Sequence, residues 1–232
     1  MHRHRLILLF LGWLIVTAVG ARADGGMQLP ERFDYRWSLA GFKGALARLF
    51  VPGRGEGRLT TASSTGDDRA ELLTTELLIS SSDGKRDEFW LYGAEIDAAR
   101  KRTVRSWSAQ RFRGKSRRKE RDAGEIEALD LASSIYYLRR ERPDVASEQL
   151  IWSSGRLNPV LIQPGERGIS VWDGREVATR SYSIEGVAKP GRPRWEGNMD
   201  LVLTDDEEAI PLEIAVMRSG LRIRLELVEV VR

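Results

Sequence analysis

The sequence contains no cysteine, and its two histidines, His2 and His4, lie at the extreme N-terminus. Disulfides, structural zinc, haem ligation and the Ser-His-Asp or Cys-His forms of catalysis each need one of these residue types in their usual forms. These chemistries are lost if the N-terminal segment is removed. The chemistry that stays open is that of paired carboxylates, of Lys or Tyr as acid or base, and of metal ions with oxygen ligands.

The N-terminus has the three parts of a secretory signal peptide. Basic residues precede an apolar run of 15 residues, Leu6 to Gly20, which ends at the small-x-small sequence Ala21-Arg22-Ala23. We therefore expect residues 1–23 to be cleaved before Asp24, which leaves a periplasmic protein that is not integral to a membrane. The alternative is a retained membrane anchor, for which the apolar run is somewhat short. No cysteine follows the run, so lipid attachment there is excluded.

The net charge of the chain changes with this cleavage. The whole sequence has 37 Lys and Arg against 34 Asp and Glu, and residues 1–23 contain three arginines and no acid. The remaining chain is therefore balanced, and its charge does not favour nucleic acid or membranes as partners of the whole domain. We expect residues 24–232 to form a single domain, and without disulfides that domain must be held by its own core.

Short β-strand patterns occupy most of the chain. Phe33, Tyr35, Trp37 and Leu39 alternate with polar residues, which is the period of a half-buried strand, and Asp173-Gly174 is typical of a two-residue hairpin turn. The expected fold is mainly β, an antiparallel meander that curls into an open or closed β-barrel. The expected strands are 33–39 and 45–51 as an opening hairpin, then 57–63, 69–80, 87–92, 148–153, 159–163, 168–172, 175–184, 194–203, 211–217 and 221–231.

One helix is expected near the middle of the chain, from Asp130 to Arg140. Leu131, Ile135 and Leu138 recur at helical spacing, and Asp130 is a suitable N-cap because its carboxylate can accept from free N–H groups of the first turn. Arg139 and Arg140 suit the negative end of the helix dipole, and Pro143 prevents continuation. This central helix divides two long β-rich halves.

Three stretches of the sequence carry a resemblance to a known family. They are Phe33 to Trp37, the helix region Asp130 to Arg139, and Asp205 to Leu212 followed by Ser219-Gly220-Leu221. Over nearly the whole mature chain their order and spacing resemble DUF3108, a family of secreted bacterial domains of unknown function. Its central motif commonly reads Asp-Pro-Leu-Ser, where this chain has Leu131 and Ala132 in the second and third places. The resemblance implies a curved sheet, as in periplasmic lipoprotein carriers, that wraps a helix and leaves an apolar groove.

A non-catalytic binding or cell-envelope maintenance role follows as the functional hypothesis, with a lipid, acyl chain or lipoprotein segment on the concave face of the sheet. Large aromatic side chains and a guanidinium group would suit such an amphipathic ligand, while packing in the core is the alternative use of each. Six tryptophans remain after cleavage: Trp37, Trp90, Trp107, Trp152, Trp172 and Trp195. The candidate ligand-binding residues are Trp37, Tyr136, Tyr137, Arg139 and Trp172.

The segment 100–121 has eleven Lys and Arg against one acid, Glu120, and looks like a hairpin with Gly114-Lys115 at its tip. It favours a second hypothesis, a protein-interaction module or a surface for anionic headgroups, and a solvated pair of strands is the alternative. Nucleic acid is not expected as a partner in the periplasm. The candidate partner-binding residues are Arg105, Trp107, Arg111, Arg113, Lys115, Arg117 and Arg118.

Four adjacent carboxylates, Asp205 to Glu208, precede Pro211. Their spacing lacks the alternating ligands and glycine turn of a calcium loop, so a charged hairpin tip is the preferred interpretation. We expect no cofactor, no metal and no catalytic residues. A carboxylate-based hydrolase is the least favoured alternative, because no pairing of acids can be derived from the sequence.

Overall fold

The computed structural model describes residues 30–41, 53–65, 71–81, 88–97, 102–112, 114–122, 127–153, 156–191, 194–218 and 221–232. The expected signal peptide, the expected strand 45–51 and Arg113 lie outside these ranges. The described elements are twelve strands and the helix α2: β1 (Glu31–Ala40), β2 (Arg54–Thr65), β3 (Glu71–Ser81), β4 (Phe89–Asp97), β5 (Arg102–Phe112), β6 (Lys115–Asp122), α2 (Leu131–Glu141), β7 (Ser147–Ser153), β8 (Arg156–Trp172), β9 (Arg175–Gly186), β10 (Asn198–Thr204), β11 (Pro211–Arg218) and β12 (Leu221–Val231).

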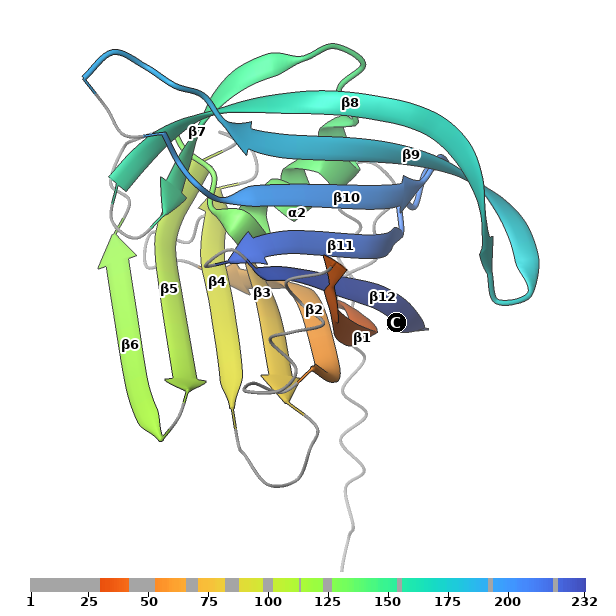
Figure 1. The fold of residues 1–232 in the computed structure, drawn as a ribbon, viewed down its shortest axis with the longest axis horizontal. Helices are drawn as coiled ribbons and strands as arrows, with labels where there is room; N and C mark the ends of the chain where they lie inside the picture. Colours follow the sequence, from red (N-terminus) through yellow and green to blue (C-terminus); the bar gives the residue numbers. More distant parts are fainter. Residues whose placement is uncertain are drawn as a thin grey trace, which may run out of the picture.

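All twelve strands form one antiparallel sheet, which confirms the mainly-β prediction. The strand order is β6-β5-β4-β3-β2-β1-β12-β11-β10-β9-β8-β7, so the first and last strands are neighbours in the middle of the sheet. On each side of that pair, five further strands follow one another as a meander (Figure 1). In this order β6 and β7 are the two ends of the sheet. The curved sheet is therefore open rather than a closed barrel.

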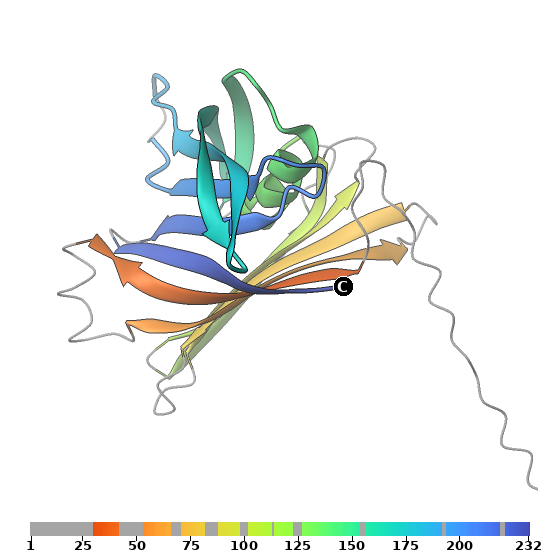
Figure 2. The same cartoon turned by 90° about the vertical axis from the view of Figure 1, so that its right-hand side faces the viewer.

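Helix α2 lies between the two halves of the curved sheet (Figure 2). Its expected N-cap is confirmed: the Asp130 carboxylate accepts from the Ser133 N–H at 2.7 Å, and the Ser133 hydroxyl accepts from the Asp130 N–H at 2.6 Å. This reciprocal capping box satisfies two backbone donors at the start of the helix. At the other end Arg142 takes a left-handed backbone with φ of 44°, and its N–H donates to the Leu138 carbonyl.

The main chain just before α2 links strands that are far apart in the sheet. Thr103 N–H of β5 donates to the Ala128 carbonyl, and Leu129 exchanges backbone hydrogen bonds with Leu150 and Trp152 of β7. This segment therefore connects β5 to β7 next to the end of β6. Among the described residues, no helix combines the length and the apolar character needed to cross a membrane.

The core lies on the concave face and contacts α2. Phe33, Tyr35 and Trp37 of β1 point into it with at most 2% of each side chain exposed. The neighbouring strand provides the space for them, because a Cβ added at Gly55 would lie 2.5 Å from the Trp37 Nε1 and 2.0 Å from the Ser80 carbonyl oxygen. Glycine at this strand position is therefore a packing requirement rather than a turn signal.

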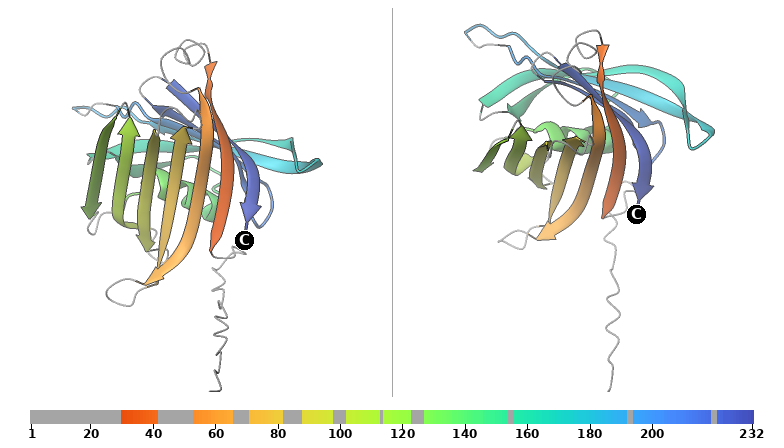
Figure 3. Two further views of the ribbon diagram at one scale, coloured as in Figure 1. Left: turned by 90° about the horizontal axis from the view of Figure 1, so that it is seen from below. Right: turned by 60° about the horizontal axis from the view of Figure 1, so that its bottom comes forward.

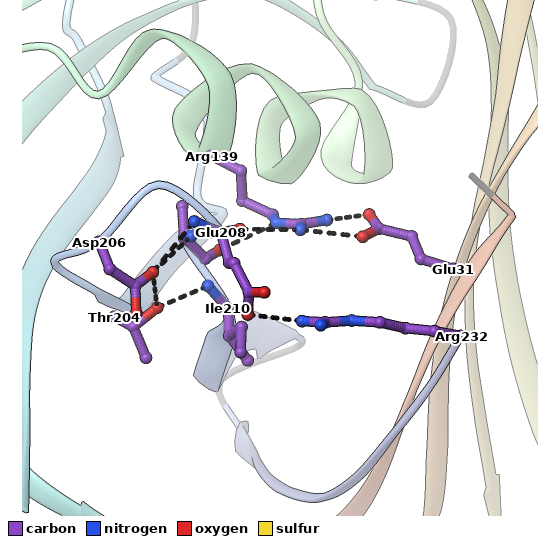
Figure 4. Close-up of polar contacts among 8 residues, drawn as sticks. Glu31, Arg139, Thr204, Asp206, Glu208, Ile210 and Arg232 are labelled. Carbon is purple, nitrogen blue, oxygen red and sulfur yellow. Dashed lines mark hydrogen bonds and ion pairs between the residues drawn. The ribbon is translucent and has the colours of Figure 1, made fainter. Parts of the chain in front are cut away.

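Arg139 of α2 is buried and makes several polar contacts inside the molecule (Figure 4). Its guanidinium forms a bidentate ion pair with Glu31 of β1 and lies 4.6 Å from the centre of the Phe33 ring. It also donates to the carbonyls of Ala209, at 2.9 Å, and Glu208, at 3.2 Å. Arg139 thus joins the helix, the central strand and the β10–β11 connection, rather than serving the helix dipole alone.

Two strand predictions need correction. The runs 159–163 and 168–172 belong to one strand, β8, in which the pairing with β9 shifts between Pro164 and Arg167. A β-bulge takes the place of the break expected between these two runs, and the Ser181 hydroxyl donates to the Glu166 carbonyl within it. The strand expected at 194–203 begins only at Asn198, because the Trp195 ring packs over Gly197 and leaves this segment outside the ladder.

The opening hairpin expected between 33–39 and 45–51 is also not the pairing of β1. One edge of β1 pairs with β2 and the other pairs with β12 over nearly its whole length. The expected hairpin from segment 100–121 is confirmed, since β5 pairs with β6 from Arg105 to Phe112 and Gly114 takes a positive φ of 73° at its tip.

We predict that Arg139→Met lowers the free energy of unfolding by about 3–5 kcal/mol, because it leaves the Glu31 carboxylate buried without its partner. The double variant Glu31→Gln/Arg139→Met should recover a part of that loss, since no buried charge remains. Urea denaturation measures both. The matched control is Arg140→Met on the same helix, whose side chain is about one-third exposed, and its loss should stay below about 1 kcal/mol. Equal losses for the two arginines would contradict the prediction.

Candidate ligand-binding pocket

A pocket of about 480 Å³ opens on the concave face of the sheet. Its walls are formed by strands β3 to β6, the start of α2, the end of β7, the segment 195–198 and residues of β11 and β12. Figure 3 shows β3 to β6 as adjacent strands of one wall, with α2 beyond them. The pocket therefore extends between β6 and β7, the two end strands of the open sheet.

The polarity of this wall changes strand by strand. Residues that pair directly across antiparallel strands share a face, so the ladder defines rows that run from the open edge inward. One row runs from Arg117 of β6 through Gln110 and Trp90 to Ile79 of β3. The next row runs from Lys119 through Ser108 and Tyr92 to Leu77. Cations thus lie at the edge, neutral polar groups next, then aromatic rings, and aliphatic side chains deepest.

Two further tryptophans complete the pocket from the opposite side. Trp152 of β7 and Trp195 belong to its lining. The Arg121 guanidinium of β6 lies 5.8 Å from the centre of the Trp152 ring, a cation–π distance. The Trp152 Nε1 is shielded from solvent and has no acceptor among the described residues. Arg121 and Trp152 thereby bring together the two ends of the open sheet.

Asp130 contributes a carboxylate at the helix end of the pocket. Burial raises its pKa from 3.8 to about 6, against the effect of hydrogen bonds from Ser133, Ala132 and Ser106, which lower it. The cost of desolvating the charged form therefore exceeds the stabilisation by its donors. Because the carboxylate caps α2, its lone pairs are largely used by the helix.

The five residues predicted to bind a ligand lie elsewhere. Trp37 is in the core, where its Nε1 donates to the Ser80 carbonyl at 2.6 Å. Tyr136 packs in a small buried cluster with Leu73, Ala94 and Ile96, and Tyr137 lies against the main core. Arg139 is held by Glu31, and Trp172 ends β8 beside its hairpin turn. None of the five lines the pocket on the concave face.

The candidate partner-binding residues are divided between the two faces of the β5–β6 hairpin. Arg117 lines the pocket, whereas Arg105 and Arg118 both pair with Glu120 on the outer face. Lys115 is exposed and Arg111 lies over the Phe89 ring. Trp107 also borders the pocket, but its indole lies against Gly93 on the outer face and donates to Glu76 at 2.9 Å. Arg113 lies outside the described residues.

Sequence reasoning missed Tyr92, Lys119 and Arg121 as pocket residues, and it placed Trp90, Trp152 and Trp195 only in a general aromatic set. The period of two along β6 was a usable signal, since Arg117, Lys119 and Arg121 are alternate residues and must share a face. The face they share with Trp90 and Tyr92 depends on the strand register, which the sequence does not show.

A second pocket, of about 600 Å³, lies elsewhere in the described structure. Charged residues of β1 and β2, including Asp34, Arg36 and Arg58, make up much of its lining. Burial acts to raise the pKa of Asp34, but its pairs with Arg32 and Arg58 outweigh burial and lower it. The Asp34 carboxylate in this pocket is therefore already neutralised by two arginines.

The acidic cluster Asp205 to Glu208 organises a turn. Asp206 Oδ1 accepts from the N–H groups of Glu208 and Ala209 and from the Thr204 hydroxyl. Glu208 pairs with Arg232, and Asp205 pairs with Arg167. These carboxylates stabilise the β10–β11 connection, whose carbonyl groups accept hydrogen bonds from Arg139. Their role is therefore structural.

Asp130 makes stability depend on pH, and Asp130→Asn tests this. A carboxyl that titrates higher in the folded than in the unfolded chain stabilises fully below its unfolded pKa, and this contribution is lost as pH rises through about 6. We expect wild type to lose about 3 kcal/mol relative to Asp130→Asn between acidic and neutral pH. Asparagine keeps the cap without the charge. Denaturant unfolding from pH 4 to pH 7.5 measures the difference, and parallel curves would refute it.

No protein-family model and no curated protein matches this chain. Among solved structures it is similar to a β-barrel-like protein of the domain of unknown function DUF1849 from Brucella abortus. The two share 14% sequence identity with a TM-score of 0.45, over 87% of this chain and 96% of that one.

Proposed function

We propose that this chain is a non-catalytic binding protein of the periplasm that serves cell-envelope maintenance and holds an apolar or amphipathic ligand in the concave pocket. The ligand would be a lipid, an acyl chain or a lipoprotein segment. The observation that carries the proposal is the pocket of about 480 Å³ with an aromatic and aliphatic interior. Pockets of this size and lining are typical of sites for single small ligands.

The environment of the pocket's acids supports binding rather than catalysis. Asp130 and Glu196 are the carboxylates among the described lining residues. Asp130 is committed to the helix cap, and Glu196 is exposed on the segment before β10. A hydrolase with two carboxylates would need both directed at one substrate bond.

The resemblance to DUF3108 also supports the proposal of a binding role. It implies a curved sheet around a helix with an apolar groove, and the arrangement of α2 inside an open sheet agrees with that description. An architecture of this kind hosts many functions, so the pocket residues, rather than the fold, carry the argument.

A second candidate function is protein docking at β6. This strand is at one end of the sheet, and all its side chains except Arg121 are exposed, with Lys115, Arg117 and Arg118 among them. An acidic segment in an extended conformation could pair with such an edge. Binding of an acidic peptide that Arg118→Glu abolishes, without any amphiphile binding, would favour this function.

We predict that the protein binds a fluorescent fatty acid and that Trp90→Ala weakens the binding about tenfold, because it removes an aromatic surface from the interior of the pocket. The matched control is Trp172→Ala, which removes the same side chain outside the pocket. Its dissociation constant should stay within about twofold of wild type. Fluorescence titration measures both. Absence of binding by wild type, or equal effects of the two variants, would contradict the pocket assignment.

Export gives a separate prediction. When the full-length chain is expressed in a bacterium with a periplasm, we expect the mature form in the periplasmic fraction, beginning at Asp24 because the small-x-small site precedes it. Intact mass spectrometry of that fraction measures the N-terminus. A full-length chain in the membrane fraction would instead support the retained anchor.

A further inference from the structure

The two faces of strand β6 differ in how their positive charges are neutralised. On the outer face, Glu120 pairs with Arg105 and with Arg118. On the inner face, Arg117, Lys119 and Arg121 line the pocket, and within the described ranges no carboxylate lies at ion-pair distance from any of them. The outer charges therefore have a protein counter-ion and the inner charges do not.

An unpaired row of cations inside a hollow is a favourable place for an anion. Low-dielectric walls focus the field of such charges, and arginine or lysine bonds to a carboxylate or phosphate are stronger than neutral hydrogen bonds. The neighbouring strand adds two neutral hydrogen-bonding residues, Gln110 and Ser108. They lie directly opposite Arg117 and Lys119 in the β5–β6 ladder. This edge of the pocket is therefore suited to a charged head.

The opposite end of the same rows is suited to a chain of hydrocarbon. Trp90 and Tyr92 follow on β4, and Ile79 of β3 is the deepest lining residue of these rows. Leu77 lies beside Ile79 on β3 but is buried in the core. The distance from one strand to the next is about 4.8 Å, so the change from cation to aliphatic spans about 14 Å across three strand spacings. A ligand that follows these rows needs a polar head and an apolar tail at that separation.

We propose that the pocket binds a single-chain anionic amphiphile, with its carboxylate or phosphate head at Arg117, Lys119 and Arg121 and its acyl chain directed inward along Trp90 and Tyr92. This rests on the proposed function and adds the charge, the chain number and the orientation of the ligand. The pocket volume of about 480 Å³ fits one chain rather than a two-chain lipid. The head lies at the open edge of the sheet, where the ligand enters.

The test compares two double variants of the full chain that remove the same number of positive charges. Arg117→Gln/Lys119→Gln removes cations of the inner face, and Arg105→Gln/Arg118→Gln removes cations of the outer face. All four side chains are exposed, so both variants should unfold at temperatures close to wild type. Any difference in ligand affinity then reports position rather than net charge.

Three probes of equal chain length separate the head from the tail: palmitate, palmitoyl lysophosphatidylglycerol and neutral monopalmitoylglycerol. Titration calorimetry below the critical micelle concentration should give an affinity for at least one anion about tenfold above that for the neutral probe. The inner-face variant should lower the affinity for that anion to the affinity for the neutral probe. The outer-face variant should leave the affinity for the anion unchanged. Raising the ionic strength from about 0.05 M to about 0.5 M should weaken the binding of the two anionic probes and leave the binding of the neutral probe unchanged.

The outcomes distinguish this inference from the function beneath it. Equal affinities for the neutral and anionic probes, or equal losses of affinity in the two double variants, would contradict an anionic head group. The proposal of a lipid-binding pocket would still stand. Failure of all three probes to bind overturns the proposed function as well. Between the two anions, the tighter one identifies whether the head is a carboxylate or a phosphate.

Discussion

The buried ion pair between Arg139 and Glu31 is the contact on which the rest of the arrangement depends. It joins α2 to β1 in the middle of the sheet, and the same guanidinium donates to the carbonyls of Glu208 and Ala209. A buried ion pair offsets the cost of its desolvation only when its remaining hydrogen-bond donors also have acceptors. Here the carbonyl groups of the β10–β11 turn are those acceptors. The position of the helix inside the sheet, and hence of the pocket wall at Asp130, follows from this contact.

The open edge of the sheet combines two requirements. A free strand edge invites pairing with other chains, and charged side chains along β6 oppose this. Because successive residues alternate between faces, some of these charged side chains, Arg117, Lys119 and Arg121, line the inner surface. Closure of β6 onto β7 would remove the edge but would also seal the pocket, so a site open to a ligand requires that the sheet stay open.

Local patterns predicted local structure well. The Asp130 cap, the helix and the alternation in β1 depend on residues close in the chain, and each is present as expected. The errors arose where distant contacts override local signals. A break is expected between the strands 159–163 and 168–172, but pairing with β9 carries β8 through this segment as a bulge. Arg139 reads as a helix-end cation, but Glu31, 108 positions away, binds it in the core.

The sequence by itself determined the absence of histidine and cysteine chemistry after residue 4, the mainly-β class, the central helix and its cap, because composition and short-range periodicity suffice for these. It assigned Trp37 and Trp172 to a ligand and Trp107 to a partner, and it left the other three tryptophans in a general aromatic set. Only the tertiary structure assigned Trp37 to the core, Trp107 to the outer face and Trp90 to the pocket. The physical reason is that strand register and the curvature of the sheet, which are set by contacts between distant residues, decide which face becomes core, pocket or solvent.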